Sequence, residues 1–219
     1  RPLTFARPKH LLPAAGRPVL DHVLCALAEA GVTEAVFVVA PHAPALRQFI
    51  GDGSRWGMSV QFAVQDVPRG LADAVWAARA HVAGERFLVY LGDTLLSGGV
   101  SEFVASFAAS EAQASLIVRP VEDPRPFGVV VVEGGRVQRL VEKPADPPSN
   151  LCIVGVYGFG PEIFDSIQRI TPSARGELEI TDAIHDLLMR GGRVECHVTD
   201  SFWADAGSAE ALLGANAHY

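Results

Sequence analysis

Short apolar runs alternate along this chain with segments whose apolar residues recur at helical spacing. The run AVFVVA, residues 35–40, is typical of a buried strand. Leu20, Val23 and Leu24 instead fall on one face of a helix, and Gly31 follows as its stop signal. Because βα units in this pattern pack around one sheet, we predict an α/β fold with a mixed, mainly parallel sheet flanked by helices.

The same reasoning places the remaining elements. Strands are expected at residues 60–64, 87–91, 114–118, 128–132, 136–141, 151–159 and 194–198. Helices are expected at residues 46–50, 71–80, 100–110, 161–170 and 180–190, with a last one from about residue 209. Glu133-Gly134-Gly135 predicts a hairpin, and residues 203–205 are expected in a turn. No repeat or linker divides the chain, so one domain over residues 1–219 is expected.

Composition narrows the class of protein. The 219 residues are 49% apolar and 20% charged, which excludes a disordered chain. The net charge is 18 minus 25, or −7, so a basic surface for nucleic acid is not expected. No apolar stretch approaches the roughly 20 residues that span a bilayer, and the first residues lack a secretory signal. We therefore expect a soluble, cytoplasmic protein with no membrane or nucleic-acid partner.

The cysteines and the first residue carry two further expectations. Cys25, Cys152 and Cys196 are odd in number and widely spaced, which favours reduced core thiols over a disulfide framework or a zinc site. Position 1 is Arg rather than Met. We expect residues missing before it to contribute to function.

Three charged residues at the ends of predicted elements could carry chemistry. Lys9 lies between Pro8 and Pro13, which would fix it as a point charge for a phosphate, although a solvated surface lysine is the simpler interpretation. Asp93 directly follows a predicted strand, where open α/β sheets bind ligands and where a carboxylate suits Mg²⁺. Asp205 could return to the same sheet edge, or it could cap the last helix, for which Ser208 is better placed.

A second group of charged residues lies in the C-terminal half. Glu142 and Lys143 end a strand and could hold a polyol hydroxyl and a phosphate, although alternation sends them to opposite sides unless the strand ends there. A surface ion pair is the alternative. The segment GELEITD is typical of a helix start, and Arg175 lies just before that helix, where it is free to reach a ligand.

Other chemistries lack their motifs. The chain has no G-x-x-x-x-G-K-[ST], G-x-G-x-x-G or G-x-S-x-G, which argues against a P-loop NTPase, a dinucleotide-binding dehydrogenase and an α/β-hydrolase. Its seven histidines show no metal-ligand spacing. Trp56, Trp76 and Phe62 are expected in the core rather than stacked on nucleic-acid bases.

Ten segments, in order along the whole chain, resemble the sugar-1-phosphate nucleotidylyltransferases, and among these the glucose-1-phosphate thymidylyltransferases. They are RPLT, PKHLLP, GDGSRWG, QDVPRGLADA, YLGD, PFGVV, EKP, SNLCIVGVYGF, ARGELEITD and FWADAGS. The resemblance implies a Rossmann-like nucleotidyltransferase fold. It also implies a Mg²⁺-dependent reaction in which a nucleoside triphosphate, here dTTP, and glucose 1-phosphate give dTDP-glucose and pyrophosphate, in a homo-oligomer.

The resemblance also implies a role for each matched residue. Lys9 would contact the nucleotide phosphates, Gln65 and Gly70 would read the pyrimidine base, and Asp93 with Asp205 would hold the metal. Gly128, Glu142 and the backbone of Ile153 would bind the sugar, and Lys143 and Arg175 would hold its phosphate. Lys9, Asp93, Lys143 and Asp205 would form the catalytic set.

Two departures from the family pattern leave alternatives open. The family begins with a strand and a glycine-rich phosphate loop before the position of Arg1, so we expect residues 1–219 to be a core that lacks this segment and any C-terminal extension. Thr94 stands where Asn is usual, and Phe127 replaces a common Tyr. A UTP- or mannose-1-phosphate-using relative therefore remains an alternative, as does a non-catalytic sugar-nucleotide-binding scaffold.

Overall fold

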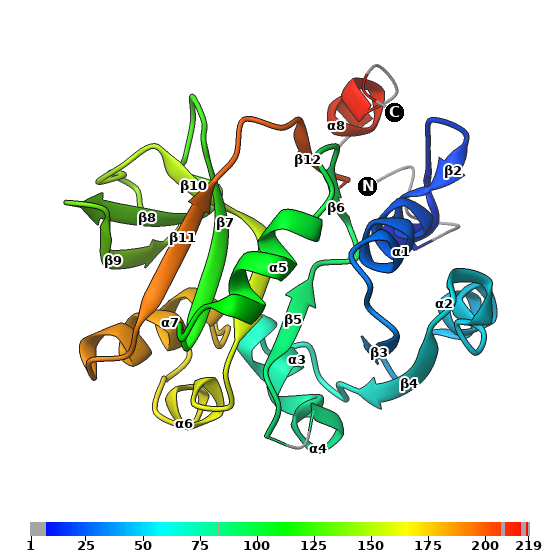
Figure 1. The fold of residues 1–219 in the computed structure, drawn as a ribbon, viewed down its shortest axis with the longest axis horizontal. Helices are drawn as coiled ribbons and strands as arrows, with labels where there is room; N and C mark the ends of the chain where they lie inside the picture. The colour runs from blue at the N-terminus through cyan, green and yellow to red at the C-terminus, as the bar shows by residue number, and fades with distance from the viewer. Residues whose placement is uncertain (1–7, 83, 207–208, 216–217, 219) are drawn as a thin grey trace.

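The computed structural model describes residues 8–82, 84–206, 209–215 and 218 (Figure 1). Its strands are β1 Pro13–Ala14, β2 Arg17–Pro18, β3 Glu34–Val39, β4 Ser59–Val64, β5 Phe87–Tyr90, β6 Thr94–Leu96, β7 Ala114–Pro120, β8 Gly128–Glu133, β9 Arg136–Glu142, β10 Leu151–Phe159, β11 Val194–Val198 and β12 Trp203–Asp205. Its helices are α1 Val19–Glu29, α2 Pro44–Ile50, α3 Leu71–Ala77, α4 Arg79–Val82, α5 Ser101–Ala109, α6 Ile163–Ile167, α7 Ile180–Met189 and α8 Ala209–Ala215, with short 3-10 helices at Lys9–Leu11 and Ser54–Trp56. Within this described part, no helix is long and apolar enough to cross a bilayer.

The main sheet is mixed, as predicted, but its pairings are mostly antiparallel. Its strands lie in the order β11, β7, β10, β8 and β9, and β5 also pairs with β10. Among the described pairings, β11 with β7 and β3 with β4 are parallel, and the others are antiparallel. The prediction of a mainly parallel sheet is therefore wrong. The short turn at Gly134 makes β8 and β9 a hairpin, and β10 runs opposite to β5, β7 and β8.

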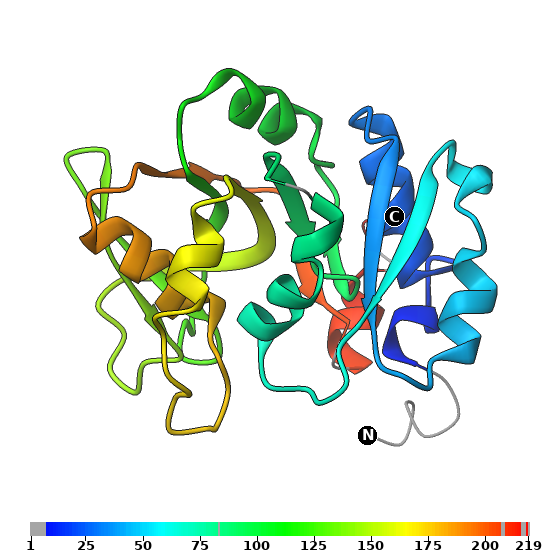
Figure 2. The same ribbon diagram turned by 90° about the horizontal axis from the view of Figure 1, so that it is seen from below.

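Helices cover both faces of this sheet, with α6 and α7 on one face and α5 on the other (Figure 2). In β7, Leu116 and Val118 face the core that contains α6 and α7, whereas Ile117 between them faces the core that contains α5. Each residue of β10 from Cys152 to Phe159 is buried. Because both faces of these strands are buried, their sequences are continuous apolar runs rather than alternating apolar and polar residues. Such runs can be recognised in the sequence.

The sheet forks at the middle of β10. One edge of β10 pairs with β7 along its length, apart from a bulge between Ile153 and Tyr157. On the other edge, the first half of β10 pairs with β8 through Cys152, and its second half pairs with β5 from Val156 onward. The end of β5 and the start of β8 therefore meet at the bulge.

Gly155 lies in the bulge, where the residues that follow β5 pass close to its backbone. Its φ is +86°, and its carbonyl accepts a hydrogen bond from the N–H of Leu91 at 2.9 Å. A Cβ at this position would lie 2.7 Å from Oγ1 of Thr94 and 3.0 Å from Cδ1 of Leu91. Glycine is required both by the backbone conformation and by this close approach.

The structure also contains smaller, two-stranded sheets. β3 and β4 form a parallel pair next to α1 and α2, and β12 pairs antiparallel with β6. The predicted elements at 20–28, 46–50 and 60–64 match α1, α2 and β4. The predicted helix at 71–80 is instead divided at Ala78 into α3 and α4, and the predicted turn at 203–205 is the strand β12.

The remaining core predictions are confirmed where the structure describes them. Trp56 is buried, and Trp76 and Phe62 are partly buried and pack against two different clusters of buried apolar residues. The three cysteines are unpaired, with Cys152 buried. Ser208 and the segment RPLT lie outside the described residues.

We expect Gly155→Ala to lower the free energy of unfolding by about 1–3 kcal/mol, because the new Cβ adds a steric clash to a strained φ. Gly99→Ala is the matched control, since Gly99 also has a positive φ, +64°, but open space at its Cβ position. Denaturant unfolding of both variants measures the difference. Equal losses in the two variants would contradict a packing role for Gly155.

Candidate active site

A cavity of about 230 Å³ lies at the fork of the sheet. The ends of β5 and β9, the start of β8, the middle of β10 and the loop before α7 all contribute to its wall. Its charged and polar lining residues are Asp93, Thr94, Glu142, Lys143, Arg175, Glu177, Glu179, Thr181 and Asp205, and Gly128, Ile153, Phe127 and Trp203 also line it. Most of the predicted site residues, far apart in the sequence, therefore share one cavity.

Asp93 lies in the turn that follows β5 and forms an ion pair with Lys9. Lys9 comes from the short 3-10 helix after Pro8, which packs against this turn. A Cβ at Gly92 would lie 3.2 Å from Cδ2 of His10, so glycine permits this packing. The lysine is therefore held beside the carboxylate, which argues against a freely solvated surface position.

Asp205 reaches the same place by strand pairing. β12 lies antiparallel to β6 with Asp205 opposite Thr94, and the N–H of Ala206 donates to the carbonyl of Asp93 at 2.8 Å. Both carboxylates line the cavity. Asp205 thus belongs to a strand beside Asp93.

Asp93 and Asp205 together suit a magnesium ion that keeps water and substrate ligands, rather than a metal ion enclosed entirely by protein ligands. No group of three or more His, Cys, Asp or Glu side chains suited to a metal occurs in the described part of the chain. Mg²⁺ commonly takes one or two carboxylates and completes its octahedral shell with water and substrate phosphates. Asp93 and Asp205, which both line a cavity with room for a ligand, match that donor set.

Glu142 and Lys143 point into the cavity together, contrary to simple strand alternation. β9 ends at Glu142, and Lys143 has a φ of +40°, unusual for a residue with a side chain. The N–H of Lys143 donates to the carbonyl of Phe127 at 3.0 Å, which holds this turn. Strain of this kind persists where the surrounding structure imposes it, often at functional sites.

Glu142 is fixed from the opposite side by Thr181. The buried Thr181 hydroxyl donates to Oε2 of Glu142 at 2.6 Å. Gly128 pairs with Glu142 in the hairpin, and a Cβ there would lie 2.9 Å from Oγ1 of Thr181 and 3.2 Å from Cδ1 of Ile153. Glycine at 128 therefore leaves the space in which Glu142, Thr181 and Ile153 meet.

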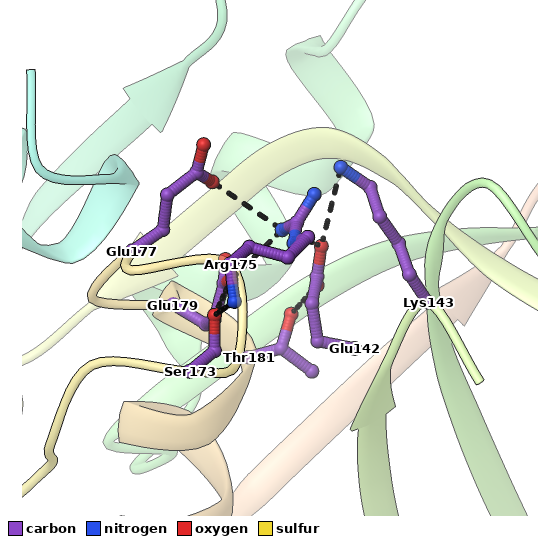
Figure 3. Close-up of polar contacts among 7 residues, drawn as sticks. All are labelled: Glu142, Lys143, Ser173, Arg175, Glu177, Glu179 and Thr181. Carbon is purple, nitrogen blue, oxygen red and sulfur yellow. Dashed lines mark hydrogen bonds and ion pairs between the residues drawn. The ribbon is translucent and has the colours of Figure 1, made fainter.

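The sequence predicts that Arg175 is free to reach a ligand. In the structure it instead lies among three carboxylates (Figure 3). Its Nη2 lies 2.8 Å from Oε1 of Glu179 and 3.3 Å from the nearest oxygens of both Glu142 and Glu177. Lys143 approaches Oε1 of Glu142 at 3.7 Å. The helix α7 begins at Ile180, as predicted, but Glu179 makes no side-chain cap and bonds to Arg175 instead.

Gln65 and Gly70 lie together, outside the cavity wall. The Gln65 amide donates to the carbonyl of Gly70 at 3.2 Å and to Oδ2 of Asp73 at 2.8 Å. Gly70 has a φ of +110°, and a Cβ there would lie 2.7 Å from the backbone nitrogen of Leu178. The next residue, Leu71, lines the cavity, so α3 begins at the cavity wall directly after this loop.

Sequence reasoning missed several residues at the site. Thr181, Glu177 and Glu179 were attributed to helix initiation, and no periodicity identifies their side-chain partners. His10 lies against Gly92, and burial lowers the pKa of its imidazole below the ordinary value. Phe127 and Trp203 form an edge-on pair with centroids 4.8 Å apart at the cavity.

Comparison with known proteins agrees with this geometry. A sequence model described as nucleotidyl transferase matches residues 1–219. The chain belongs to this nucleotidyl transferase family. It is 42% identical over 219 residues to the low-salt glycan biosynthesis nucleotidyltransferase Agl11 of Haloferax volcanii, and 41% identical over 217 residues to a glucose-1-phosphate thymidylyltransferase of Streptomyces griseus. Each alignment covers 99% of this chain and 61% of the relative, so the chain spans about three fifths of the length of these curated relatives.

One solved structure is similar to this chain in both fold and sequence. It is a crystal structure of a candidate glucose-1-phosphate thymidylyltransferase from Bacillus anthracis in complex with sucrose. The TM-score is 0.91 at 32% identity, and the alignment covers 99% of this chain and 88% of that one. The Rossmann-like nucleotidyltransferase fold is thereby confirmed.

The environment of Glu142 gives the fold a pH-dependent component of stability. Burial raises the pKa of Glu142 above its ordinary 4.5, and the charge of Glu179 acts in the same direction, against Thr181 and the two cations. A carboxyl with a raised pKa stabilises the fold fully below its unfolded-state pKa, and this contribution is lost as the pH rises through the raised pKa.

We therefore expect the stability of the wild type, measured relative to Glu142→Gln, to fall as the pH rises from about 4.5. Denaturant unfolding across a pH series measures this difference. Glu133→Gln, at the exposed end of β8, is the control and should show no such fall. A relative stability that rises with pH would contradict the assigned direction.

Proposed function

We propose that residues 1–219 form a nucleotidyltransferase core that joins dTTP to glucose 1-phosphate and releases pyrophosphate. The observation that carries this proposal is one cavity with carboxylates at Asp93 and Asp205 and cations at Lys143 and Arg175. The first pair suits the metal-bound triphosphate, and the second pair suits a phosphate monoester. The glycan-biosynthesis and thymidylyltransferase names of the relatives support the same class of reaction.

The proposed reaction needs positioning rather than a covalent nucleophile. An oxygen of the sugar phosphate attacks the α-phosphorus of the nucleotide, the bond between the α-phosphorus and the bridging oxygen breaks, and pyrophosphate leaves with that electron pair. Two polyanions must approach each other, so fixed cations lower the barrier by holding and neutralising them. Lys143 and Arg175 would hold the sugar phosphate, and Lys9 would lie against the nucleotide phosphates.

Magnesium is part of the proposal through Asp93 and Asp205. Both are short carboxylates that line the cavity from adjacent backbone segments. When bound, the ion would neutralise charge on the triphosphate. Lys9 would keep the Asp93 carboxylate oriented through their ion pair.

Different residues would select the sugar and the nucleotide base. Glu142, fixed by Thr181, would accept a sugar hydroxyl, with Gly128 and the backbone of Ile153 beside it. Gln65 and the backbone at Gly70 would read the edge of the pyrimidine base. Because thymine and uracil differ by one methyl group, the preference for dTTP over UTP is a finer part of the proposal than the reaction class.

The cellular setting is proposed from the family resemblance. We infer a homo-oligomer that works in the cytoplasm. Light scattering of the full natural protein measures its mass, and a monomeric mass would overturn the oligomer.

The experiment for the reaction measures pyrophosphate release by the full natural protein. Nucleotides dTTP and UTP are each paired with glucose 1-phosphate and mannose 1-phosphate, with and without Mg²⁺. We expect the highest kcat/KM with dTTP and glucose 1-phosphate, and loss of turnover when the metal is chelated. No turnover with any pair, but retained sugar-nucleotide binding, would instead identify a non-catalytic scaffold.

Substitution of Asp93 tests the site within this assay. We expect Asp93→Asn to lower kcat by about 10²- to 10³-fold, the range for losing one electrostatic group that stabilises a transition state. Asp165→Asn, exposed on α6, is the control and should keep wild-type kcat. Wild-type turnover in Asp93→Asn would remove this residue from the proposed mechanism.

A further inference from the structure

The charges around Arg175 do not favour a phosphate in the ligand-free arrangement. Arg175 and Lys143 supply two positive charges, whereas Glu142, Glu177 and Glu179 supply three negative ones. A phosphate monoester carries up to two negative charges near neutral pH, so this cluster must change before the phosphate is attracted. Loss of one carboxylate contact to Arg175 would remove the excess negative charge of this cluster.

The geometry at one nitrogen shows which contacts are strong. The Nη2 atom of Arg175 has two N–H groups, but carboxylate oxygens of three glutamates lie within 3.3 Å of it. Glu179 at 2.8 Å and Glu142 at 3.3 Å accept hydrogen bonds. Glu177, also at 3.3 Å, has only an ion pair. Its contact therefore rests on charge without a hydrogen bond.

Glu179 and Glu177 also differ in burial, and the more buried of the two is the one with the stronger contact to Arg175. The Glu179 side chain is 6% exposed and also accepts a hydrogen bond from the Ser173 hydroxyl at 2.7 Å. Moving it away would leave a buried carboxylate without its partner, which is costly. The Glu177 side chain is 46% exposed and can turn into water at little cost.

We propose that Glu179 is a positioning residue that fixes Arg175 at the cavity, and that Glu177 occupies the place on Arg175 that the phosphate of the sugar takes. This inference rests on the proposed function, since it assigns the phosphate of that substrate to Arg175. Figure 3 shows the arrangement: Glu179 and Ser173 lie on one side of the guanidinium and Glu177 approaches from another. When the sugar phosphate binds, its phosphate replaces the Glu177 carboxylate at Arg175, while the buried contact between Glu179 and Arg175 stays.

Two isosteric substitutions on the same arginine should therefore act in opposite directions. In Glu177→Gln, the internal competitor is weakened, so we expect the KM for glucose 1-phosphate to fall about two- to fivefold, the range for one exposed ion pair. In Glu179→Gln, the guanidinium loses its buried charged partner, so we expect that KM to rise about tenfold. The KM for dTTP and kcat should change little in both.

The assay is run on the full natural protein, together with calorimetric titration of glucose 1-phosphate in the absence of nucleotide. Glu102→Gln, exposed on α5, is the control for loss of a surface charge. Ser173→Ala guards against poor folding of Glu179→Gln, because it removes only one donor to Glu179 and should raise the KM by about two- to threefold. Thermal unfolding verifies that each variant is folded.

The outcomes separate this inference from the proposed reaction. Shifts of the KM in the same direction for Glu177→Gln and Glu179→Gln, or no shift in a folded Glu179→Gln and in Ser173→Ala, would overturn the inference while turnover stands. Absence of turnover, with opposite shifts in the calorimetric affinity, would overturn the proposed reaction and still support the roles of both glutamates. Unchanged affinity in all variants would overturn the roles proposed for both glutamates.

Discussion

The fork in the sheet at Gly155 is the constraint on which the site depends. β10 keeps β7 along one edge, but its other edge changes from β8 to β5 at the bulge. Asp93 lies just after the end of β5, and Gly128 lies at the start of β8. The space between these two strands is the cavity, which is lined by backbone and polar side chains. A regular strand would have closed this space with a further pair of hydrogen bonds.

One extended segment ties the two halves of the site together. The N–H of Leu178 donates to the carbonyl of Arg69 at 2.6 Å, and the N–H of Ala72 donates to the carbonyl of Leu178 at 3.1 Å. The loop assigned to the nucleotide base is thus bonded directly to the segment that carries Arg175. The two regions proposed to bind substrate are therefore joined by backbone hydrogen bonds.

The sequence predicts most of the elements but few of their contacts. Long apolar runs such as β7 and β10 are recognisable because they are buried on both faces, whereas β6 and β12, three residues each, have no periodicity to detect. Strand direction was mispredicted because neighbours along the chain need not be neighbours in the sheet. The motifs place Lys143 and Arg175 at the site, but the positive φ of one and the carboxylate partners of the other depend on tertiary packing.

An acidic chain can offer cations to phosphates if each cation is held before the ligand arrives. Lys9 is paired with Asp93, Lys143 lies near Glu142, and Arg175 contacts Glu179. These partners limit the side-chain freedom that would otherwise be lost on binding, and they neutralise the cations so that the free cavity does not carry excess positive charge. In the proposed exchange, the attraction for phosphate would come from replacing a carboxylate by a ligand oxygen. Because that exchange depends on local geometry, the overall charge of −7 places no limit on it.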